Sequence, residues 1–306
     1  MGGLVFCVPP GIGDISWIYS KVSHMARKGN RRVEFKPAPD LPSRADSYVK
    51  LLPGIEFTGS GYPYGLMINK LLPTDTDLES LPDGEYMIGL NLHLEQGKFL
   101  HDAFPKQPTD YHYPLNLPPL SKAVEVLSRV PGDLARIGFY CSSHIHRPEL
   151  GFWSAEEWVA FLKMVKAKIP NSVFVAVGAP YDDKTKIVAE RVRKSVDRNI
   201  LVFMNQGMGD TLNAVKSLHY FFAFPSGLGI LADVVDVPCM MWFWGNVRGM
   251  EHMKDFFGKY ADPKNVESGR HLNVPYVGVG PSFDVFLDKG IKWLDPRVRG
   301  GRGAAR

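Results

Sequence analysis

The feature that most constrains the fold is a repeating order of apolar runs, glycine-rich or polar turns, and amphipathic stretches. The apolar runs fit buried strands, and the amphipathic stretches fit helices. Such alternation is typical of α/β proteins in which crossover helices join the strands of doubly wound parallel sheets. We expect strands at 4–8, 32–36, 55–58, 86–90, 135–141, 172–177, 199–204, 219–224 and 239–244, and helices at 15–28, 43–52, 120–130, 155–168, 183–195, 210–217 and 230–235.

Two domains are expected from the length of 306 residues and from two series of strands and helices. Residues 104–119 are rich in proline and lack periodicity, so they are expected to be a loop over one face or the approach to a linker. Ser154 with Glu157 predicts a capping box that opens a helix. The predicted parts are a Rossmann-like acceptor domain at 1–132, a Rossmann-like nucleotide-sugar domain at 133–281, a helix at 282–296 that packs back on the first domain, and a disordered basic tail at 297–306.

Composition narrows the class of protein. The chain is 45% hydrophobic and 22% charged, as in ordinary globular proteins, and a run of 18 apolar residues, which would indicate a membrane span, does not occur. The first residues lack the pattern of a signal peptide, so we expect a cytoplasmic protein. Cys7, Cys141 and Cys239 each lie in an apolar run and are expected to be reduced core residues. The net charge of +4 is too small to indicate nucleic-acid binding by itself.

The strongest candidate for phosphate binding is the turn Ser226-Gly227-Leu228-Gly229, which follows one predicted strand and opens a helix. In open α/β sheets, ligands bind beyond the carboxyl ends of the strands. The free N–H groups of a first helical turn carry partial positive charge, and glycines let an anion approach them. A plain helix N-cap in a glycine-rich turn is the alternative interpretation.

Polar side chains also follow the strands predicted at 135–141 and 172–177. After the first strand, hydroxyl, imidazole and guanidinium groups suit a diphosphate that leaves with negative charge; these are Ser142, Ser143, His146 and Arg147. The candidates for the nucleoside are Gly178, its polar neighbour Asp182, and Met208 in the turn 204–210. Turns without a ligand are the alternative here.

Asp14 follows Gly11-Ile12-Gly13 in the first turn between a strand and a helix. One interpretation makes Asp14 the N-cap of the helix that follows. The other makes it a general base, because a carboxylate opposite a phosphate site can take the proton of an attacking hydroxyl group. Gly11 and Gly13 would then leave room for the incoming substrate. Asp75-Thr76-Asp77 has the spacing of a metal motif, but it does not end an apolar strand, and we expect no metal site.

These turns, in this order, resemble the ADP-heptose:lipopolysaccharide heptosyltransferase family. The similar segments are GIGDISWIYSKV at 11–22, FWSAEEWVAFL at 152–162, VFVAVGAP at 173–180 and FFAFPSGLGILADVVDVPCMMWFWG at 221–245. The resemblance implies the GT-B architecture, two facing Rossmann-like domains, and an inverting, metal-independent sugar transfer with Asp14 as the base. The chain departs from the family at Pro225, where the family has an acid, and at His146 or Arg147, where it has a lysine.

The function expected from this resemblance is transfer of a sugar from a nucleoside-diphosphate sugar to an acceptor hydroxyl, without a cofactor. Residues 91–114 are rich in aromatic and polar side chains, and Asn91, His93 and Glu95 are expected on the acceptor side together with Gly11 and Gly13. The family's default acceptor is a lipopolysaccharide-type sugar. A hydroxymethylated base in viral DNA is the alternative acceptor, and it fits the basic tail.

Two other classes of function stay open. The altered motifs are compatible with a non-catalytic protein that binds a nucleotide sugar or a glycan. Gly11, Gly13 and Ser16, with Glu34 about 20 residues further on, approach the dinucleotide fingerprint of an NAD-dependent oxidoreductase. Its third glycine is missing, however, and the sequence does not indicate the oligomeric state.

Overall fold

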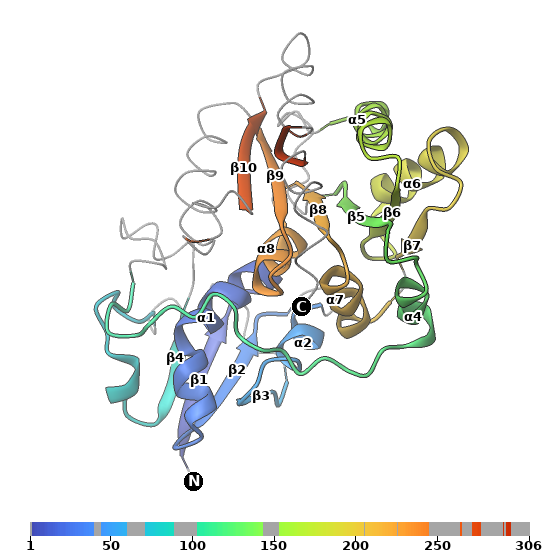
Figure 1. Cartoon of the computed structure of the whole chain (residues 1–306). Coiled ribbons are helices and arrows are strands. Elements are labelled where there is room, and N and C mark those ends of the chain that lie inside the picture. The colour runs from blue at the N-terminus through green and yellow to red at the C-terminus, as the bar shows by residue number, and fades with distance from the viewer. Residues whose placement is uncertain are drawn as a thin grey trace. The chain divides into compact units, whose positions relative to one another are not determined.

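The computed structural model describes residues 2–39, 44–59, 71–88, 103–142, 153–204, 206–224, 226–244, 264, 271–276, 290 and 292–294. The contacts between residues divide the chain into two compact units, whose elements are labelled in Figure 1. Unit 1 comprises Met1–Pro119 and Gly207–Leu212, and unit 2 comprises Leu120–Gln206 and Asn213–Arg306. The predicted tail lies outside the described residues.

Unit 1 contains a parallel sheet of four strands in the order β3-β2-β1-β4. The strands are β1 (Gly3–Val8), β2 (Arg32–Pro37), β3 (Ile55–Glu56) and β4 (Gly84–Met87). Helix α1 (Ile12–Lys28) packs on β1, α2 (Arg44–Val49) packs on β2, and a 3-10 helix, η2, spans Leu78–Ser80. The predicted strands and helices of this half are therefore present, with shifted ends.

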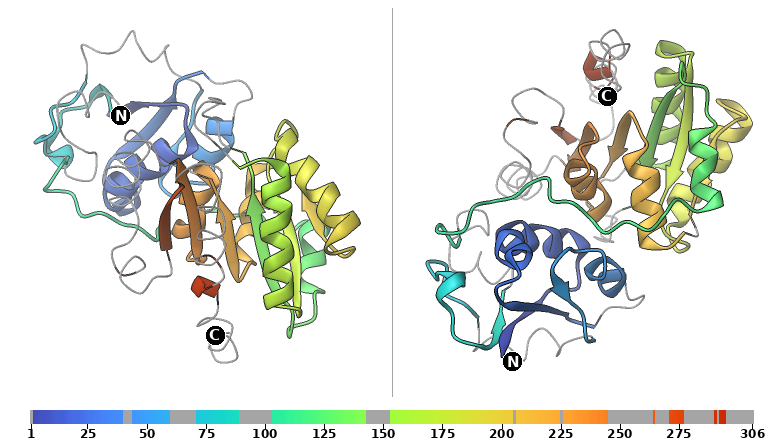
Figure 2. Two further views of the ribbon diagram at one scale, coloured as in Figure 1. Left: turned by 90° about the horizontal axis from the view of Figure 1, so that it is seen from above. Right: turned by 60° about the horizontal axis from the view of Figure 1, so that its bottom comes forward.

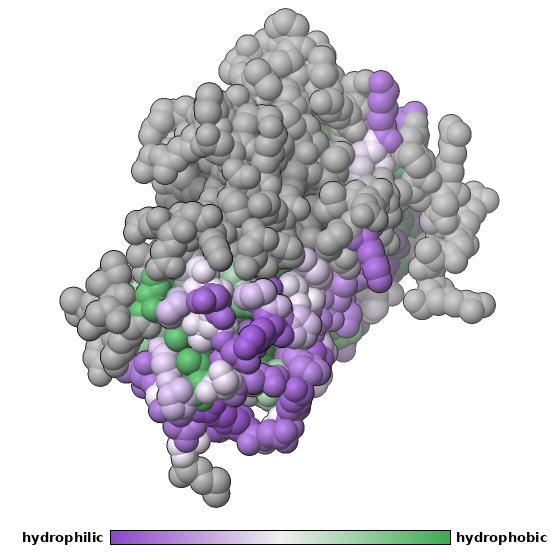
Figure 3. Space-filling model, turned by 90° about the vertical axis from the view of Figure 1, so that its left-hand side faces the viewer, coloured by the Kyte–Doolittle hydropathy of each residue, from purple (hydrophilic) through white to green (hydrophobic). Residues whose placement is uncertain are grey.

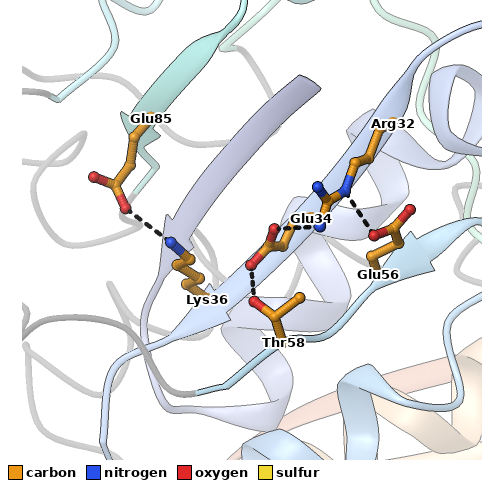
Figure 4. A network of polar contacts seen from close by, with 6 residues as sticks. All are labelled: Arg32, Glu34, Lys36, Glu56, Thr58 and Glu85. Atoms are coloured by element: carbon orange, nitrogen blue, oxygen red, sulfur yellow. Dashed lines mark hydrogen bonds and ion pairs between the residues drawn. The ribbon is translucent and has the colours of Figure 1, made fainter. Parts of the chain in front are cut away.

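The two faces of the unit 1 sheet differ in polarity. Phe6 and Phe35 are fully buried on one face, where the ring of Tyr19 from α1 meets Phe35 edge-on. Because side chains alternate along a strand, Arg32, Glu34 and Lys36 of β2 point to the opposite face. That face carries a polar network, shown in Figure 4, of Arg32, Glu34, Lys36, Glu56, Thr58 and Glu85. Parallel sheets usually bury both faces in apolar side chains, so this polar face is a peculiarity of the chain.

The proline-rich segment 103–119 runs across α1, as the views in Figures 1 and 2 show. The backbone N–H of Asp110 donates to the carbonyl of Ser20 (2.8 Å), and that of Asn116 donates to the carbonyl of Leu51 (2.8 Å). These contacts confirm the predicted loop over one face. They also tie the segment to unit 1, so the chain enters unit 2 after Pro119 and not at the predicted boundary of 132/133.

Unit 2 contains a parallel sheet of six strands in the order β10-β9-β8-β5-β6-β7. The strands are β5 (Ala135–Tyr140), β6 (Ser172–Val177), β7 (Leu201–Phe203), β8 (Tyr220–Ala223), β9 (Cys239–Trp244) and β10 (His271–Tyr276). This is the strand order of the Rossmann fold, and it includes one strand, β10, that the sequence did not predict. The helices are α4 (Lys122–Ser128), α5 (Ala155–Lys168), α6 (Asp183–Ser195), α7 (Met208–Lys216) and α8 (Gly227–Val234).

Aromatic side chains dominate the core of unit 2. Trp153, Trp158 and Trp242 are fully buried, and their rings lie 4.7–5.5 Å apart between centroids. The ring of Trp293 lies 5.8 Å from those of Tyr220 and Phe222, so residues 292–294 pack within unit 2. This corrects the prediction that the last helix packs on the first domain; most of that predicted helix lies outside the described residues.

Several expectations from composition can be compared with the structure. All three cysteines are buried, as predicted for core residues, and none of them forms a disulfide. Among the helices of the described residues, none is long and apolar enough to cross a membrane. On the side of the molecule seen in Figure 3, the described surface is mainly hydrophilic, with small hydrophobic areas.

Candidate active site

Asp14 lies in the first turn of α1, beyond the carboxyl end of β1. The helix begins at Ile12, earlier than predicted, and Gly11 is its N-cap residue. The backbone N–H of Ile15 accordingly donates to the carbonyl of Gly11 (3.0 Å). The interpretation of Asp14 as the N-cap is therefore wrong, because its side chain lies inside the helical segment.

The carboxylate of Asp14 occupies space that is open because residue 11 is a glycine. A Cβ atom at Gly11 would overlap Oδ2 of Asp14. Burial raises the pKa of Asp14 to about 6, and a hydrogen bond from its own backbone offsets part of this effect. Within the described parts of the chain, Asp14 forms no ion pair that would lower its pKa further. The side chain is thus a carboxylate of increased basicity at the edge where ligands of such sheets bind.

Hydroxyl groups fix the first half of α1 against the rest of unit 1. The Ser16 Oγ lies 2.5 Å from the Tyr113 hydroxyl, which lies 2.7 Å from the Tyr48 hydroxyl. Burial raises the pKa of both tyrosines, so their hydroxyl groups are neutral hydrogen-bonding groups at any physiological pH. This network holds the helix two residues after Asp14, and it joins α1, α2 and the segment 103–119.

In unit 2, the strand order reverses between β5 and β8, which are hydrogen-bonded neighbours. Tyr140, at the end of β5, is paired in register with Ala223, at the end of β8. The predicted phosphate residues Ser142 and Ser226 follow these two adjacent strand ends. A reversal of this kind is where Rossmann-like domains bind their ligands. Ser143, His146 and Arg147 lie outside the described residues.

Ser226 is the N-cap residue of α8, and its side chain accepts a hydrogen bond from one backbone N–H of the first turn. The Oγ of Ser226 accepts from the N–H of Gly229 (3.2 Å). A Cβ atom at Gly229 would lie 2.5 Å from the sulfur of Met241, so this glycine permits close packing of α8 on β9. The cap interpretation is confirmed. It is compatible with anion binding, because the amides of Gly227 and Leu228 belong to the first turn and have no intrahelical acceptor.

The three residues predicted for the nucleoside have different surroundings. The carboxylate of Asp182 is buried, and it accepts from the Tyr140 hydroxyl (3.0 Å) and from the Ala179 backbone N–H (2.5 Å). A Cβ atom at Gly178 would lie 2.9 Å from both Asp182 and Met204. Gly178 and Asp182 thus shape the turn after β6, whereas Met208 opens α7 in the part that belongs to unit 1. Their contacts to a nucleoside stay predictions.

The acceptor side is described only in part. Gly13 is buried in the first turn of α1, and Gly11 accommodates the Asp14 carboxylate. Asn91, His93 and Glu95 lie outside the described residues, so their role stays a prediction.

Two motifs considered in the sequence have other uses in the structure. Glu34 lies in the middle of β2, where Arg32 and Thr58 hold its carboxylate, whereas a ribose would bind beyond the strand end. This arrangement argues against a dinucleotide site. Asp77 caps η2 and accepts from Lys106 (3.2 Å) and Gln107 (3.1 Å), so its carboxylate has a structural use.

Sequence reasoning missed Thr185, which is fully buried in the first turn of α6. Its Oγ1 accepts from the backbone N–H of Cys141 (3.1 Å) and lies 3.4 Å from the Oγ of Ser142. No local pattern in the sequence indicates this contact, because it joins the end of β5 to the first turn of α6, which are adjacent only in the folded unit.

Comparison with solved structures identifies the architecture. The structure is similar to ADP-heptose lps heptosyltransferase II of E. coli, with a TM-score of 0.64 and 9% identity over 98% of this chain and 100% of that one. The chain has the GT-B fold. It is also similar to the glycosyl transferase family 9 protein from Veillonella parvula DSM 2008 (TM-score 0.54, 11% identity, 94% of this chain and 91% of that chain). E. coli heptosyltransferase WaaC with ADP is comparably similar (TM-score 0.54, 10% identity, 96% and 99%).

At the level of sequence, neither a protein-family model nor a curated protein matches the chain. The resemblance to heptosyltransferases is therefore one of fold, and it confirms the predicted fold class.

Proposed function

We propose that the chain is an inverting, metal-independent glycosyltransferase that uses a nucleoside-diphosphate sugar as donor. The observation that carries the proposal is the Asp14 carboxylate, which a glycine accommodates at the carboxyl edge of β1 and whose pKa burial raises to about 6. The GT-B fold supports it, because solved structures of this fold include a heptosyltransferase with ADP. The acceptor is a saccharide hydroxyl group.

In the proposed reaction, Asp14 removes the proton of the acceptor hydroxyl as its oxygen attacks the anomeric carbon. The bond between that carbon and the phosphate oxygen breaks, and the electron pair leaves with the nucleoside diphosphate. A single displacement of this kind inverts the anomeric centre. The amides of Gly227 and Leu228, the hydroxyl of Ser142, and Ser143, His146 and Arg147 would stabilise the charge of the leaving group.

A pKa of about 6 suits this role because the carboxylate is ionised at neutral pH yet more basic than an ordinary aspartate. We therefore expect kcat/KM to fall as the pH drops through about 6, since the protonated carboxyl group cannot accept a proton. A carboxylate with an ordinary pKa of 3.8 would stay ionised down to a much lower pH, and kcat/KM would not change until that pH is reached.

The test begins with a panel of ADP, UDP, GDP and CDP sugars in a thermal-shift assay. A ligand that binds only the native state adds about 2.7 kcal/mol of stability at 100 times its Kd, which such an assay detects. Slow hydrolysis of the bound donor in the absence of acceptor then gives an activity that requires no knowledge of the acceptor. A protein that only binds nucleotide sugars would show the shift without the hydrolysis.

Asp14→Asn should lower the hydrolysis rate by about 10²- to 10⁴-fold and leave donor affinity unchanged. The matched control is Asp183→Asn, which changes an exposed aspartate in the first turn of another helix, α6, and should leave the rate unchanged. A fully active Asp14→Asn variant would refute the proposed role of the carboxylate.

A further inference from the structure

Gly11 is the N-cap residue of α1, and its backbone conformation does not require a glycine. Its φ of −71° and ψ of 127° lie in the extended region, which any residue adopts. Serine, asparagine and aspartate stabilise an N-cap more than glycine does, because their side-chain oxygen accepts from a backbone N–H of the first turn. Neither backbone strain nor helix stability therefore explains the glycine at this position.

The space beside Gly11 does explain it. A Cβ atom at residue 11 would lie 2.2 Å from Oδ2 of Asp14, 3.3 Å from its Cγ and 3.8 Å from its Cβ. Apart from the adjoining residues of the chain, no other atom of the described residues would come closer than 3.8 Å to this Cβ. At Gly138, by contrast, an added Cβ would overlap Leu218 and Phe221 of the core. The missing side chain at residue 11 thus makes room for the Asp14 carboxylate in particular.

If residue 11 carried a Cβ atom, the Asp14 side chain is the part that would move. The carbonyl of Gly11 accepts from the N–H of Ile15 (3.0 Å), which ties residue 11 to the helix. The hydrogen bond between Ser16 and Tyr113 (2.5 Å) in turn holds the helix. A carboxylate turns about two side-chain bonds at lower cost than these groups can shift. An ordinary contact begins at 3.4 Å, so Oδ2 of Asp14 would have to move by about 1 Å.

We propose that Gly11 is a positioning residue: the absence of a side chain at this N-cap keeps the Asp14 carboxylate where it can take the proton of the acceptor hydroxyl. The inference rests on the proposed function, in which Asp14 is the base. Misplacing a reacting group by about 1 Å costs about 10²-fold in rate. The same movement would take the carboxylate out of the space beside residue 11 and toward water. Because burial raises the pKa of Asp14 to about 6, the pKa of the displaced carboxylate should be lower.

The experiment compares Gly11→Ala and Gly11→Ser in the full chain. Both variants add a Cβ atom, but only serine also brings an oxygen that can cap the helix. The matched control is Gly132→Ala, because a Cβ atom at Gly132 would meet nothing within 4 Å among the described residues. The measurements are the rate of donor hydrolysis at saturating donor as a function of pH, the donor affinity, and the melting temperature.

Both Gly11 variants should hydrolyse the donor about 10²-fold more slowly than the wild type and bind it with unchanged affinity. The fall of the rate on the acid side, expected near pH 6 in the wild type, should move to lower pH. Gly11→Ser should melt at a higher temperature than Gly11→Ala, although both are equally slow. Gly132→Ala should match the wild type in all three measurements.

A wild-type rate in either Gly11 variant would overturn the inference. A slow Gly11→Ala beside a fast Gly11→Ser would show that the rate follows the stability of the helix and not the position of the carboxylate. Donor affinity that falls as much as the rate would also overturn it, since Gly11 would then act in donor binding. If Gly11→Ala does not fold, Gly11→Ser decides by itself.

A stability measurement separates this inference from the proposed function. Asp14→Asn removes a buried charge and should raise the melting temperature at pH 7.5. In a Gly11→Ala background the same substitution should raise it less, because the carboxylate is already displaced. If the wild type hydrolyses no donor, the proposed function fails, and this comparison still decides whether Gly11 positions the carboxylate. Equal increases in the two backgrounds would overturn the inference whatever the activity.

Discussion

The two units differ in the kinds of side chain that hold their central elements together. In unit 1, α1 buries Ser16, Ser20 and Ser23, and the segment 103–119 supplies partners to their hydroxyls or backbone. In unit 2, tryptophan and phenylalanine rings fill the core, and the indole N–H groups of Trp158 and Trp242 lack an acceptor among the described residues.

This difference matters because hydrogen bonds are directional and apolar burial is not. A helix held by hydroxyl groups has one rotation about its axis, and one position along that axis, at which all of these groups are hydrogen-bonded. Such a helix suits a unit that presents a single carboxylate, Asp14, in a defined place. A sheet held by aromatic burial gains more stability per side chain, but it does not fix the direction of any single group. The comparison predicts different responses to substitution.

The largest effect is expected where a buried ring is removed from unit 2. Trp158→Ala should lower the free energy of unfolding by about 3–5 kcal/mol, because it leaves a cavity among Trp153, Phe161 and Trp242. Urea unfolding followed by circular dichroism measures it. Trp158→Phe, which keeps an aromatic ring, should lose clearly less. Equal losses in the two variants would mean that ring volume does not determine the stability of this core.

A smaller effect is expected from removing one oxygen atom in unit 1. Tyr113→Phe deprives Ser16 and Tyr48 of a buried partner and should cost about 1–3 kcal/mol. The control is Tyr86→Phe, because the hydroxyl of Tyr86 donates to the carbonyl of Pro82 at the surface, and its loss should cost about 0.5 kcal/mol or less. If the two tyrosine variants lose the same stability, the hydroxyl network does not hold α1 as argued.

Local signals in the sequence predicted much of the fold. The alternation of apolar and amphipathic stretches predicted the parallel strands, and Ser154 with Glu157 forms the predicted capping box. β10 was missed because Pro275 argues against a strand, yet β10 is at the edge of the sheet, where proline is tolerated. The start of α1 was placed too late because Gly11 and Gly13 have low helix propensity, although Gly11 serves as the N-cap.

The candidate site was predictable only where a turn itself carries the chemistry. Asp14 and the Ser226 turn could be proposed as candidates because each follows a strand and lies at the start of a helix. Thr185 and Tyr113 were not found, since each acts on residues far away in the sequence, at Cys141 and Ser16. For the same reason, the sequence could not show that Asp182 is held by Tyr140 and Ala179 within its own unit.

The smallest expected effect is on the pH dependence of folding stability, which has opposite signs for one residue of each unit, Asp14 and His219. Burial raises the pKa of Asp14 to about 6, so the native state binds this proton more tightly than the unfolded state. The stability that Asp14 contributes is complete below pH 3.8 and is lost as the pH rises through about 6. In unit 2, desolvation and then the charge of Arg136 lower the pKa of His219 below 6.5. Its contribution is complete above pH 6.5 and is lost as the pH falls through its native pKa.

Two variants that cannot titrate test these signs by thermal unfolding at pH 4, 5 and 7.5. Asp14→Asn should be more stable than the wild type at pH 7.5, on the order of 1 kcal/mol because solvent screens a half-buried group, and the gain should disappear at pH 4. In the wild type, the backbone N–H of Arg136 donates to Nδ1 of His219 (2.9 Å), and His219→Gln keeps an acceptor for this N–H. This variant should gain relative to the wild type at pH 5 and not at 7.5, by less than Asp14→Asn, because His219 is more exposed. If both variants gain stability at the same end of the pH range, one of the two assigned pKa shifts is wrong. The wrong shift is that of the residue whose variant does not gain stability at the expected pH.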